Sequence, residues 1–526
     1  MSVLSAKPFS WPFSWDALRD IGIAQSMLDG HFFQDPIMEG EVNWYNPLVG
    51  IIIAIIGKIS HLPLPEIYVK IGPFVTLLLP VSLVLFAYKL GGAMASLAIL
   101  CYCIFARHPL VIEWIYGCYL PWLYATHLGK AFFFLFLTAL IVYKENRKNT
   151  SLILSGVFLG LAFLSHTSAF VEGVLILIFI AIWENKKEIK ALAFNKIFNQ
   201  TRYIIAVGGI ALLVSSIYWL PILIKYQFII KNPYPSLYVT TALEPQNILS
   251  TLLKSANSFT VIGSICLIVL LFNLNYSNLN ILRFWASVIL FVLAYQIFCQ
   301  ILNKYGYIIP APYPVHHTFI SIHLLIGCFF GYGLSIIGKR IANKISTKNA
   351  SNIIYDLINL LATVSALTVC ILINAYSYTP RYLPPLSELN RGRPENRLVD
   401  ETQKYDEVYH WLLKNTQPQD KILCNELLGV RVVLPAGRKL TYTLMLYLNP
   451  YVDISIHLNK FNNIWMSLKE GKFPDFVTYL RREGIRYILV HNSDPEISLL
   501  SKTSKLKKVY SDNLVSVFQV MNLNIY

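Results

Sequence analysis

The residues best suited to chemistry are carboxylates within the first 47 residues. Asp16 and Asp20 are four residues apart, so they share a face if residues 15–28 form a helix. Arg19 lies on a neighbouring face, where it can hold either acid ionised. A carboxylate at the rim of a pocket can deprotonate a hydroxyl or an amine when burial or a second acid raises its pKa. Asp16 is therefore a candidate general base; the alternative is that these acids only solvate an interfacial helix.

Two further carboxylates, Glu39 and Glu41, flank Gly40 just before an aromatic turn. Together with Asp16 they could hold a divalent cation, which would neutralise a phosphate leaving group. An ordinary acidic loop explains the same residues. The sequence predicts Glu39 and Glu41 as supporting acids, predicts no cofactor with certainty, and leaves open whether a metal takes part.

Cationic residues elsewhere are the counterpart that a phosphate-bearing lipid would need. His316 and His317 are adjacent imidazoles where a loop enters an apolar segment. Lys130 lies near the end of another apolar segment, so it must reach the interface, pair, or face a polar cavity. Arg381 follows the last apolar segment. We expect these four residues to bind the phosphate.

Two polar residues interrupt the apolar stretch 151–183. His166 stands in the break Ser165–Ser168, and Glu172 lies inside the arm that follows. Ionisable residues at such positions usually face a protein interior or a water-filled cavity. We expect both to line a polar cavity, although a lone histidine in this place is more often structural.

The composition indicates a membrane protein with several spans. The chain has 526 residues, of which 55% are hydrophobic and 14% charged, and its mean hydropathy is +0.52. This is too apolar for an ordinary soluble globule. The net charge of +15 does not indicate a nucleic-acid partner, because the basic residues gather in short loops between apolar segments.

Ten apolar stretches have roughly helical length, and segment 48–59 is too short to span and is expected to lie along the interface. The ten stretches are 67–88, 91–106, 121–143, 151–165, 168–183, 202–219, 255–273, 282–301, 318–338 and 352–375. The pair 151–165 and 168–183 is short enough for a tilted or re-entrant hairpin. The fold class is therefore mainly α and polytopic, with about ten transmembrane helices.

The opening stretch is too acidic to lie in hydrocarbon and too rich in Trp, Phe and Met for a solvated tail. A water-facing pocket held against the bilayer satisfies both facts. It has no charged n-region followed by an apolar h-region. We expect a first transmembrane helix to be encoded upstream of Met1.

The distribution of Lys and Arg predicts the orientation, because cytoplasmic loops carry an excess of both. One set of loops holds Lys89, Lys144, Arg147, Lys148, Lys186, Lys187, Lys190, Lys196, Arg202, Arg283, Lys339, Arg340, Lys344 and Lys348. The alternate set holds only Arg107, Lys225, Lys231, Lys254 and Lys304. The first set is predicted to be cytoplasmic, which places the acidic stretch and the tail outside, in a multi-pass plasma (inner) membrane protein.

The tail changes character after a linker rich in Pro and Arg. Helical spacing covers 405–415 and 473–483, the second ended by Gly484. Strands are predicted at 421–424, 485–490, 507–510 and 514–520. We divide the chain into an outer-face first loop (1–66), a transmembrane helical domain (67–375) and an extracytoplasmic soluble α/β domain (376–526), which serves as a lid or recognises the acceptor.

These features resemble the GT-C superfamily of integral-membrane glycosyltransferases, which includes aminoarabinose transferases and protein mannosyltransferases. The resemblance rests on an acid-led helix start at 16–19, an Asp-Gly turn at 27–30, a Pro-Leu entry at 46–48, and the stretch Gly-Leu-Ala-Phe-Leu-Ser-His-Thr at 160–167. It covers the whole chain in architecture and about 40 residues by motif.

The resemblance implies that Asp16 is the catalytic base and that the donor is a polyprenyl-phosphate sugar whose phosphate contacts cationic residues on the outer face. It also implies direct displacement with inversion of the anomeric centre. In many members a second acid follows the first, whereas here Ala17 follows Asp16.

Two other classes of function remain as alternatives. A non-enzymatic flippase or transporter of lipid-linked glycans predicts internal repeats and mid-membrane charges in corresponding halves. We find no repeat, and the acids gather in the opening stretch. An envelope-assembly scaffold whose tail binds a partner would leave Asp16 without a role. The sequence does not specify the sugar, the acceptor (protein, lipid or glycan) or the oligomeric state.

Overall fold

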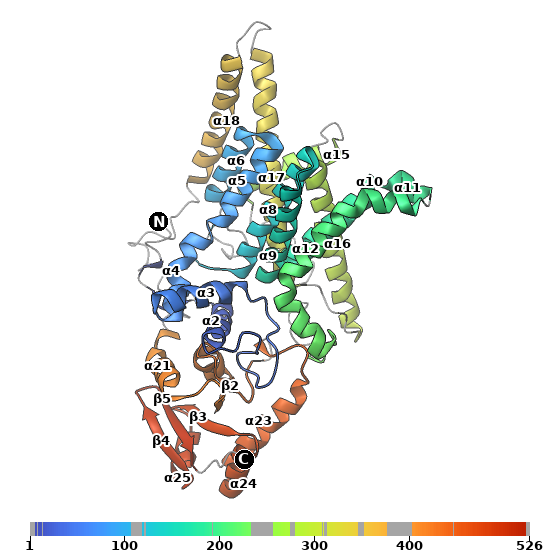
Figure 1. Ribbon diagram of the computed structural model, residues 1–526. Coiled ribbons are helices and arrows are strands. Elements are labelled where there is room, and N and C mark those ends of the chain that lie inside the picture. The colour runs from blue at the N-terminus through green and yellow to red at the C-terminus, as the bar shows by residue number, and fades with distance from the viewer. Residues whose placement is uncertain are drawn as a thin grey trace.

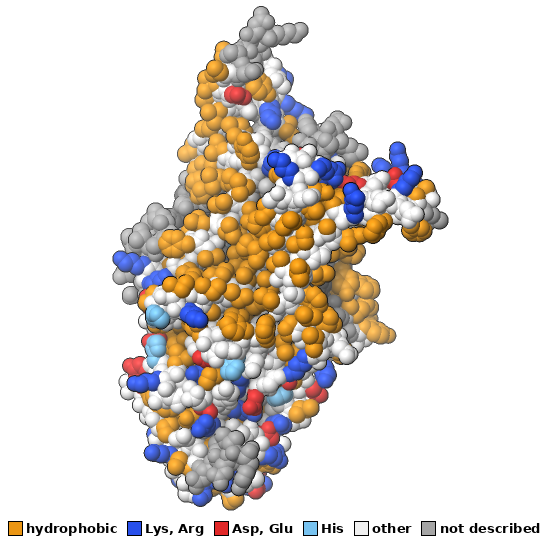
Figure 2. All heavy atoms as spheres, viewed as in Figure 1, with side chains coloured by type: hydrophobic (Ala, Val, Ile, Leu, Met, Phe, Trp, Pro, Cys, Tyr) orange, Lys and Arg blue, Asp and Glu red, His pale blue; other side chains and the backbone are white. Residues whose placement is uncertain are grey.

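The computed structural model describes residues 6–7, 9–12, 14–106, 118–119, 122–191, 193–232, 256–273, 279–307, 309, 313–345, 352–375, 402–444 and 447–521. A bundle of apolar helices forms one end of the molecule and a mixed α/β domain forms the other, with α2 and α3 between them (Figure 1). Hydrophobic side chains cover the visible face of the bundle, whereas the α/β domain carries mixed charges (Figure 2).

The bundle is built from helices of very different length. They are α3 (Leu48–Ser60), α4 (Leu64–Val75), α5 (Leu78–Gly91), α6 (Ala93–Phe105), α8 (Ala125–Asn146), α9 (Asn149–Ser165), α10 (Thr167–Glu184), α11 (Lys186–Lys190), α12 (Phe194–Tyr226), α15 (Ser258–Phe272), α16 (Asn280–Lys304), α17 (Val315–Ile345) and α18 (Asn352–Ala375). Each of the ten predicted apolar stretches falls on one or two of these helices.

Seven helical segments are long and apolar enough to cross a membrane, among the residues that the structure describes. They are 64–91, 125–146, 167–184, 194–226, 280–304, 315–345 and 353–373. The other three predicted spans are α6, α9 and α15, with 13, 17 and 15 residues. At 1.5 Å per residue these reach only about 20–26 Å, less than the ~30 Å hydrocarbon core. By length and hydropathy, seven helical segments of the described residues qualify as membrane spans, whereas the sequence predicted about ten.

Glycines allow the closest helix pairs in the bundle. Gly156 and Gly160 of α9 face α12, where a Cβ on Gly160 would lie 2.8 Å from the carbonyl oxygen of Ala211. Gly331 of α17 approaches α6 in the same way, with its Cβ position 2.9 Å from the carbonyl oxygen of Ala95. Small residues spaced by four let membrane helices pack backbone to backbone. These contacts fix the helices that carry the polar residues described below.

The α/β domain contains a five-stranded mixed sheet in the order β2-β1-β3-β5-β4. β1 (Lys421–Cys424) pairs in parallel with both β2 (Lys439–Leu440) and β3 (Ile485–His491), whereas β5 (Val515–Val520) is antiparallel to β3 and to β4 (Leu506–Ser511). Its helices are α21 (Asp406–Asn415), α22 (Glu426–Leu428), the π-helical turn η3 (Gly429–Val433), α23 (Ile454–Lys469), α24 (Phe473–Arg482) and α25 (Glu496–Lys502).

Alternating residues send side chains to two separate cores, as the period of a strand requires. Leu423 and Ile488 join α23, α24 and α25 on one face of the sheet. Ile422 and Leu489 join α21 and η3 on the other face. Trp11, Leu18, Ile37 and Met38 belong to this second core. The acidic opening stretch is therefore part of the hydrophobic core of the α/β domain.

Most predicted elements of the tail are confirmed within a residue or two. Helices α21 and α24 and strands β1, β3, β4 and β5 all lie where the sequence places them, and Gly484 has the positive φ of +68° expected after α24. The patterns in the sequence did not indicate β2, α22, η3, α23 or α25. The linker rich in Pro and Arg lies in 376–401, outside the described residues.

Helix α2 (Trp15–Leu28) confirms the predicted helix 15–28 and lies against the η3 region. Ser14 caps it, because its Oγ accepts a hydrogen bond from the backbone N–H of Asp16 at 3.2 Å. Gly22 is the point of closest approach: a Cβ there would lie 2.3 Å from the carbonyl oxygen of Leu434. Only glycine at position 22 leaves room for this contact.

We expect Gly22→Ala to weaken the docking of α2 on the α/β domain by about 1–3 kcal/mol, the usual cost of overpacking. The matched control is Gly209→Ala in α12, where no heavy atom lies within 4 Å of the added Cβ. Both changes gain the same helix propensity, about 1 kcal/mol, so the comparison isolates the close contact. Thermal unfolding in detergent measures the difference, and equal melting temperatures for the two variants would contradict the docking.

Candidate functional site

Asp16 lies in the first turn of α2, where the partial positive charge of a helix N-terminus favours a carboxylate. Its side chain is 57% exposed, and its Oδ1 lies 3.3 Å from Nη1 of Arg19. Nε of Arg19 is 3.8 Å from Oδ1 of Asp20. The guanidinium thus lies between the two acids, as the spacing in the sequence suggested.

Arg19 and Asp20 are buried although both can carry charge. The guanidinium carbon of Arg19 lies 3.1 Å from the centre of the Tyr45 ring, a cation–π contact. Within the described part of the chain, Nε and Nη2 of Arg19 and Oδ1 of Asp20 lack hydrogen-bond partners. Burial raises the pKa of Asp20 to about 7; Arg19 opposes this rise and Asp16 adds to it. The site therefore holds two different carboxyl groups: that of Asp16 is exposed, and that of Asp20 is buried and has a raised pKa.

Three imidazoles pack together at the ends of the membrane helices. The ring of His317 lies 4.0 Å from that of His316 and 4.1 Å from that of His166, measured between centroids. Oγ1 of Thr126, on α8, hydrogen-bonds to Nδ1 of His317 at 3.2 Å. His166 caps α10, and its Nδ1 accepts a hydrogen bond from the backbone N–H of Ser168. We call His166, His316 and His317 the histidine cluster.

The N-terminal half of α2 lies near the histidine cluster. The carboxylate of Asp16 is close enough to His316 to interact with it electrostatically. Arg19 interacts in the same way with His166. The structure therefore brings together residues that are 300 positions apart in the sequence, a carboxylate on one side and imidazoles on the other.

A buried polar network adjoins the histidine cluster. Lys130 Nζ lies 2.7 Å from Oε1 of Glu172, and neither side chain is exposed. Glu172 also accepts hydrogen bonds from Trp285 Nε1 at 2.8 Å, Tyr313 OH at 3.2 Å and Ser321 Oγ at 2.7 Å. The carbonyl oxygen of His317 lies 3.1 Å from the same hydroxyl, so the single O–H of Ser321 is shared between the two acceptors. Lys130 and Glu172 thus form a buried pair inside the bundle, and the carboxylate of Glu172 contacts the start of α17.

The other predicted acids contact cations of their own. Glu41 lies 2.8 Å from Lys225 and accepts a hydrogen bond from Tyr226 OH at 2.5 Å. Burial raises the pKa of Glu41, but these two partners outweigh it and lower the pKa overall. Glu39 lies 2.8 Å from Lys421 of β1. Both acids therefore tie the opening stretch to its neighbours.

The described residues contain no group of three or more His, Cys, Asp or Glu side chains arranged to hold a metal ion. In particular, Glu39 and Glu41 are engaged with Lys421 and Lys225. Asp16, Glu39 and Glu41, which the sequence grouped, are therefore not brought together in the part of the chain that the structure describes. Arg381 lies outside the described residues.

Several polar residues of the site were missed by the sequence analysis. Thr126, Trp285 and Ser321 lie inside apolar segments, where a hydroxyl or an indole carries little signal. Ser321 could have been found because it follows His317 by four residues and so shares its helix face. Nothing in the sequence relates Trp285 to Glu172.

No protein-family model matches the chain, and no curated protein matches it. Among solved structures, ArnT from Cupriavidus metallidurans in the apo state aligns with a TM-score of 0.53 at 10% identity, over 95% of this chain and 92% of that chain. The same protein bound to undecaprenyl phosphate aligns with a TM-score of 0.52 at 10% identity, over 99% and 96% of the two chains. The oligosaccharyltransferase from Archaeoglobus fulgidus, in complex with Zn and sulfate, aligns with a TM-score of 0.48 at 12% identity, over 93% and 67%. The likeness to ArnT shows that the chain has a GT-C-like fold.

The raised pKa of Asp20 predicts a pH-dependent effect of Asp20→Asn on stability. In the unfolded chain an aspartate titrates near 3.9, whereas in the fold burial raises the pKa of Asp20 to about 7. Between these values the folded state keeps a proton that the unfolded state has lost, so stability falls as pH rises through this window. Asn cannot ionise, so the variant should be more stable than the parent at pH 8, by up to about 4 kcal/mol, and lose that advantage by pH 4.

Melting temperatures of the parent protein and of Asp20→Asn between pH 4 and pH 8 test this prediction. A difference between the two proteins that stays constant over this range would contradict the buried environment of Asp20.

Proposed function

We propose that the chain is a membrane glycosyltransferase that moves a sugar from a polyprenyl-phosphate donor to an acceptor on the extracytoplasmic face. The observation that carries the proposal is the exposed carboxylate of Asp16 near the histidine cluster at one end of the bundle. The GT-C-like fold supports it, as does the fact that ArnT, a structure of this fold, was solved bound to undecaprenyl phosphate.

The proposed orientation follows from where the basic residues lie. The acidic stretch and the α/β domain lie together at one end of the bundle (Figure 1). Lys89, Lys144 and Lys186 lie at the far ends of α5, α8 and α10 or just beyond them, with the cationic side chains of the excess set. The usual cytoplasmic excess of Lys and Arg supports a site outside the cytoplasm, in a plasma (inner) membrane protein.

In the proposed reaction Asp16 takes the proton from the hydroxyl or amine of the acceptor. The freed electron pair of the acceptor attacks the anomeric carbon of the sugar. The bond from that carbon to the phosphate oxygen breaks on the opposite side, so the configuration inverts and the polyprenyl phosphate leaves. Proximity of the two reactants and stabilisation of the developing phosphate charge supply the rate enhancement. Arg19 orients the base through its contact with Asp16.

The phosphate side of the site is assigned to His316 and His317, whose ring N–H groups can donate to phosphate oxygens. We assign Lys130 a different role, because its ammonium is fully buried against Glu172. Lys130 positions the imidazoles through the network that reaches the backbone of His317. Arg381 remains a proposed phosphate contact.

Asp16→Asn should abolish sugar transfer from a polyprenyl-phosphate donor, a loss of at least about 100-fold for a missing general base. Donor binding should stay within about twofold, since Asn keeps the shape of the side chain. The matched control is Asp475→Asn, which removes an exposed carboxylate from the first turn of α24 in the α/β domain. Radiolabelled transfer assays on purified proteins make the measurement. Full activity of Asp16→Asn would reject the base.

Donor affinity and transfer rate, measured on the same purified proteins, distinguish the base from the phosphate-binding residues. The double variant His316→Ala/His317→Ala should weaken donor binding, whereas Asp16→Asn should slow the chemical step. Donor affinity that is unchanged in the double variant would remove the two histidines from the site without affecting the assignment of Asp16.

A further inference from the structure

A cavity of about 610 Å³ lies among the ends of α5, α8, α10 and α16. It is distant from the histidine cluster. Along α8, Lys144 follows Lys130 by 14 residues, which is about 21 Å of helix; along α10, Glu184 follows Thr167 by 17 residues, or about 25 Å. The cavity therefore lies at the opposite membrane surface from the proposed active site.

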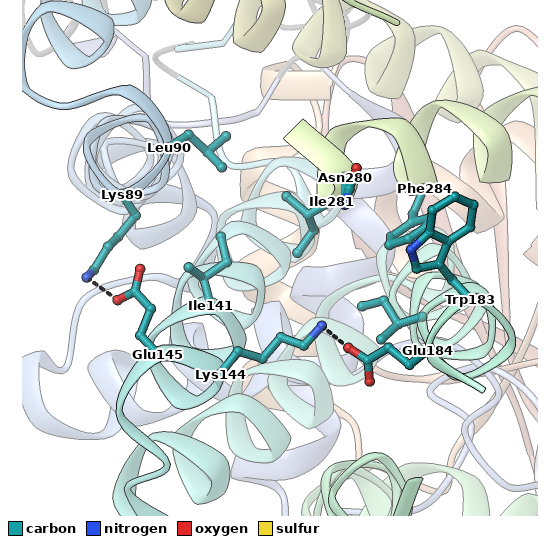
Figure 3. A pocket seen from close by; sticks show the side chains of 11 residues that line it. Lys89, Leu90, Ile141, Lys144, Glu145, Trp183, Glu184, Asn280, Ile281 and Phe284 are labelled. Atoms are coloured by element: carbon teal, nitrogen blue, oxygen red, sulfur yellow. Dashed lines mark hydrogen bonds and ion pairs between the residues drawn. The ribbon is translucent and has the colours of Figure 1, made fainter. Parts of the chain in front are cut away.

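Charged groups of both signs line one side of this cavity (Figure 3). Lys89 Nζ lies 2.8 Å from Oε2 of Glu145, and Lys144 Nζ lies 2.5 Å from Oε1 of Glu184. Between a third and a half of each of these four side chains is exposed. Tyr203 OH donates to the second oxygen of Glu184 at 2.7 Å, which fixes that carboxylate. Two cations and two anions thus alternate along the rim of the cavity.

This charge pattern favours a ligand that itself carries both signs. The two ammonium groups would attract a lone anion, but the two carboxylates would repel it. The carboxylates would attract a lone cation, but the ammonium groups would repel it. Each ammonium has three N–H donors, so contact with one carboxylate oxygen leaves donors for a phosphate. Oε1 of Glu145, which receives no hydrogen bond from Lys89, can accept from an ammonium. A zwitterion that holds a phosphate next to a primary ammonium matches both sets of groups.

The remaining wall of the cavity is apolar and ends in aromatic rings. Leu90, Ile141, Ile180 and Ile281 form the wall. Trp183 and Phe284 lie together at its side, with ring centroids 6.0 Å apart, and Trp183 is 50% exposed (Figure 3). Tryptophan at the end of a membrane helix commonly lies at the level of lipid headgroups. A molecule with hydrocarbon chains would contact this wall, whereas a free zwitterion would leave it exposed to water.

We propose that this cavity binds the phosphoethanolamine headgroup of a membrane phospholipid from the leaflet opposite the active site. The lipid phosphate contacts Lys144, its ammonium contacts Glu145, and the start of its acyl chains packs on Ile281 and the Trp183–Phe284 pair. Such a lipid ties the ends of α5, α8, α10 and α16 to one another. The proposal is independent of the glycosyltransferase assignment, because no residue of the two sites is shared.

Delipidated full-length protein in detergent, titrated with single lipids and read by native mass spectrometry, tests the proposal. Phosphatidylethanolamine should be retained at least tenfold more strongly than phosphatidylcholine, whose ammonium has no N–H, and than phosphatidylglycerol, which has no ammonium. Soluble phosphoethanolamine at the same concentration should not displace the lipid. Equal retention of the three lipids would overturn the headgroup assignment, and displacement by the soluble compound would overturn the lipid assignment.

Lys144→Met should abolish the preference for phosphatidylethanolamine, whereas the control Lys196→Met, an exposed lysine in the first turn of α12 outside the cavity, should keep it. Glu145→Gln, which removes the acceptor of the lipid ammonium, replaces Lys144→Met in the test if the latter unfolds. A preference unchanged in the folded variant would overturn the proposal. Asp16→Asn should bind the lipid as the parent does even if it has lost transfer, so the outcomes for the two sites are separate.

Discussion

The arrangement of this protein depends on how its acidic opening stretch is held between the bundle and the α/β domain. Arg438 contacts Asp29 at 2.8 Å, and Lys421 contacts Glu39 at the same distance. The pair of Lys421 with Glu39, whose acid is 56% exposed, adds little stability, about 0–1 kcal/mol. The effect of the two pairs is to fix the position of a stretch whose apolar residues already belong to the core of the domain. The C-terminal end of α2 is fixed by the contact of Asp29 with Arg438, and its N-terminal half by Trp11 and Leu18 in that core, which holds Asp16 in place.

A second constraint lies inside the bundle. Burying Lys130 and Glu172 costs several kcal/mol per ion, and their attraction offsets this only when other hydrogen bonds satisfy the pair. Trp285, Tyr313 and Ser321 supply those bonds. Such a pair is weak evidence for stability, since apolar residues of similar volume often do as well. Glu172 contacts Ser321 near the start of α17. We therefore propose that the buried pair holds the imidazoles in position for the proposed phosphate site.

Local patterns in the sequence were sufficient for much of the fold. The capped helix 15–28, the strand at 421–424 and the helix stop at Gly484 all follow from spacing and from residues with fixed conformational preferences. Long-range pairings could not be predicted in this way. The contact of Glu39 with Lys421 joins residues 382 positions apart, and nothing local distinguishes it from a solvated acid. The sequence likewise predicted that Lys130 binds phosphate, because nothing local shows that it pairs with Glu172 of another helix.

Cysteine labelling in intact cells shows on which face of the membrane Asp16 lies, and we expect the extracytoplasmic face. The eight native cysteines are free, and all except Cys101 are buried, so the background is low. A membrane-impermeant maleimide should label Asp16→Cys in cells whose inner membrane is intact. It should label Glu145→Cys, at the opposite end of the bundle, only after that membrane is opened. Labelling of Asp16→Cys only after opening would place the site in the cytoplasm and contradict the account.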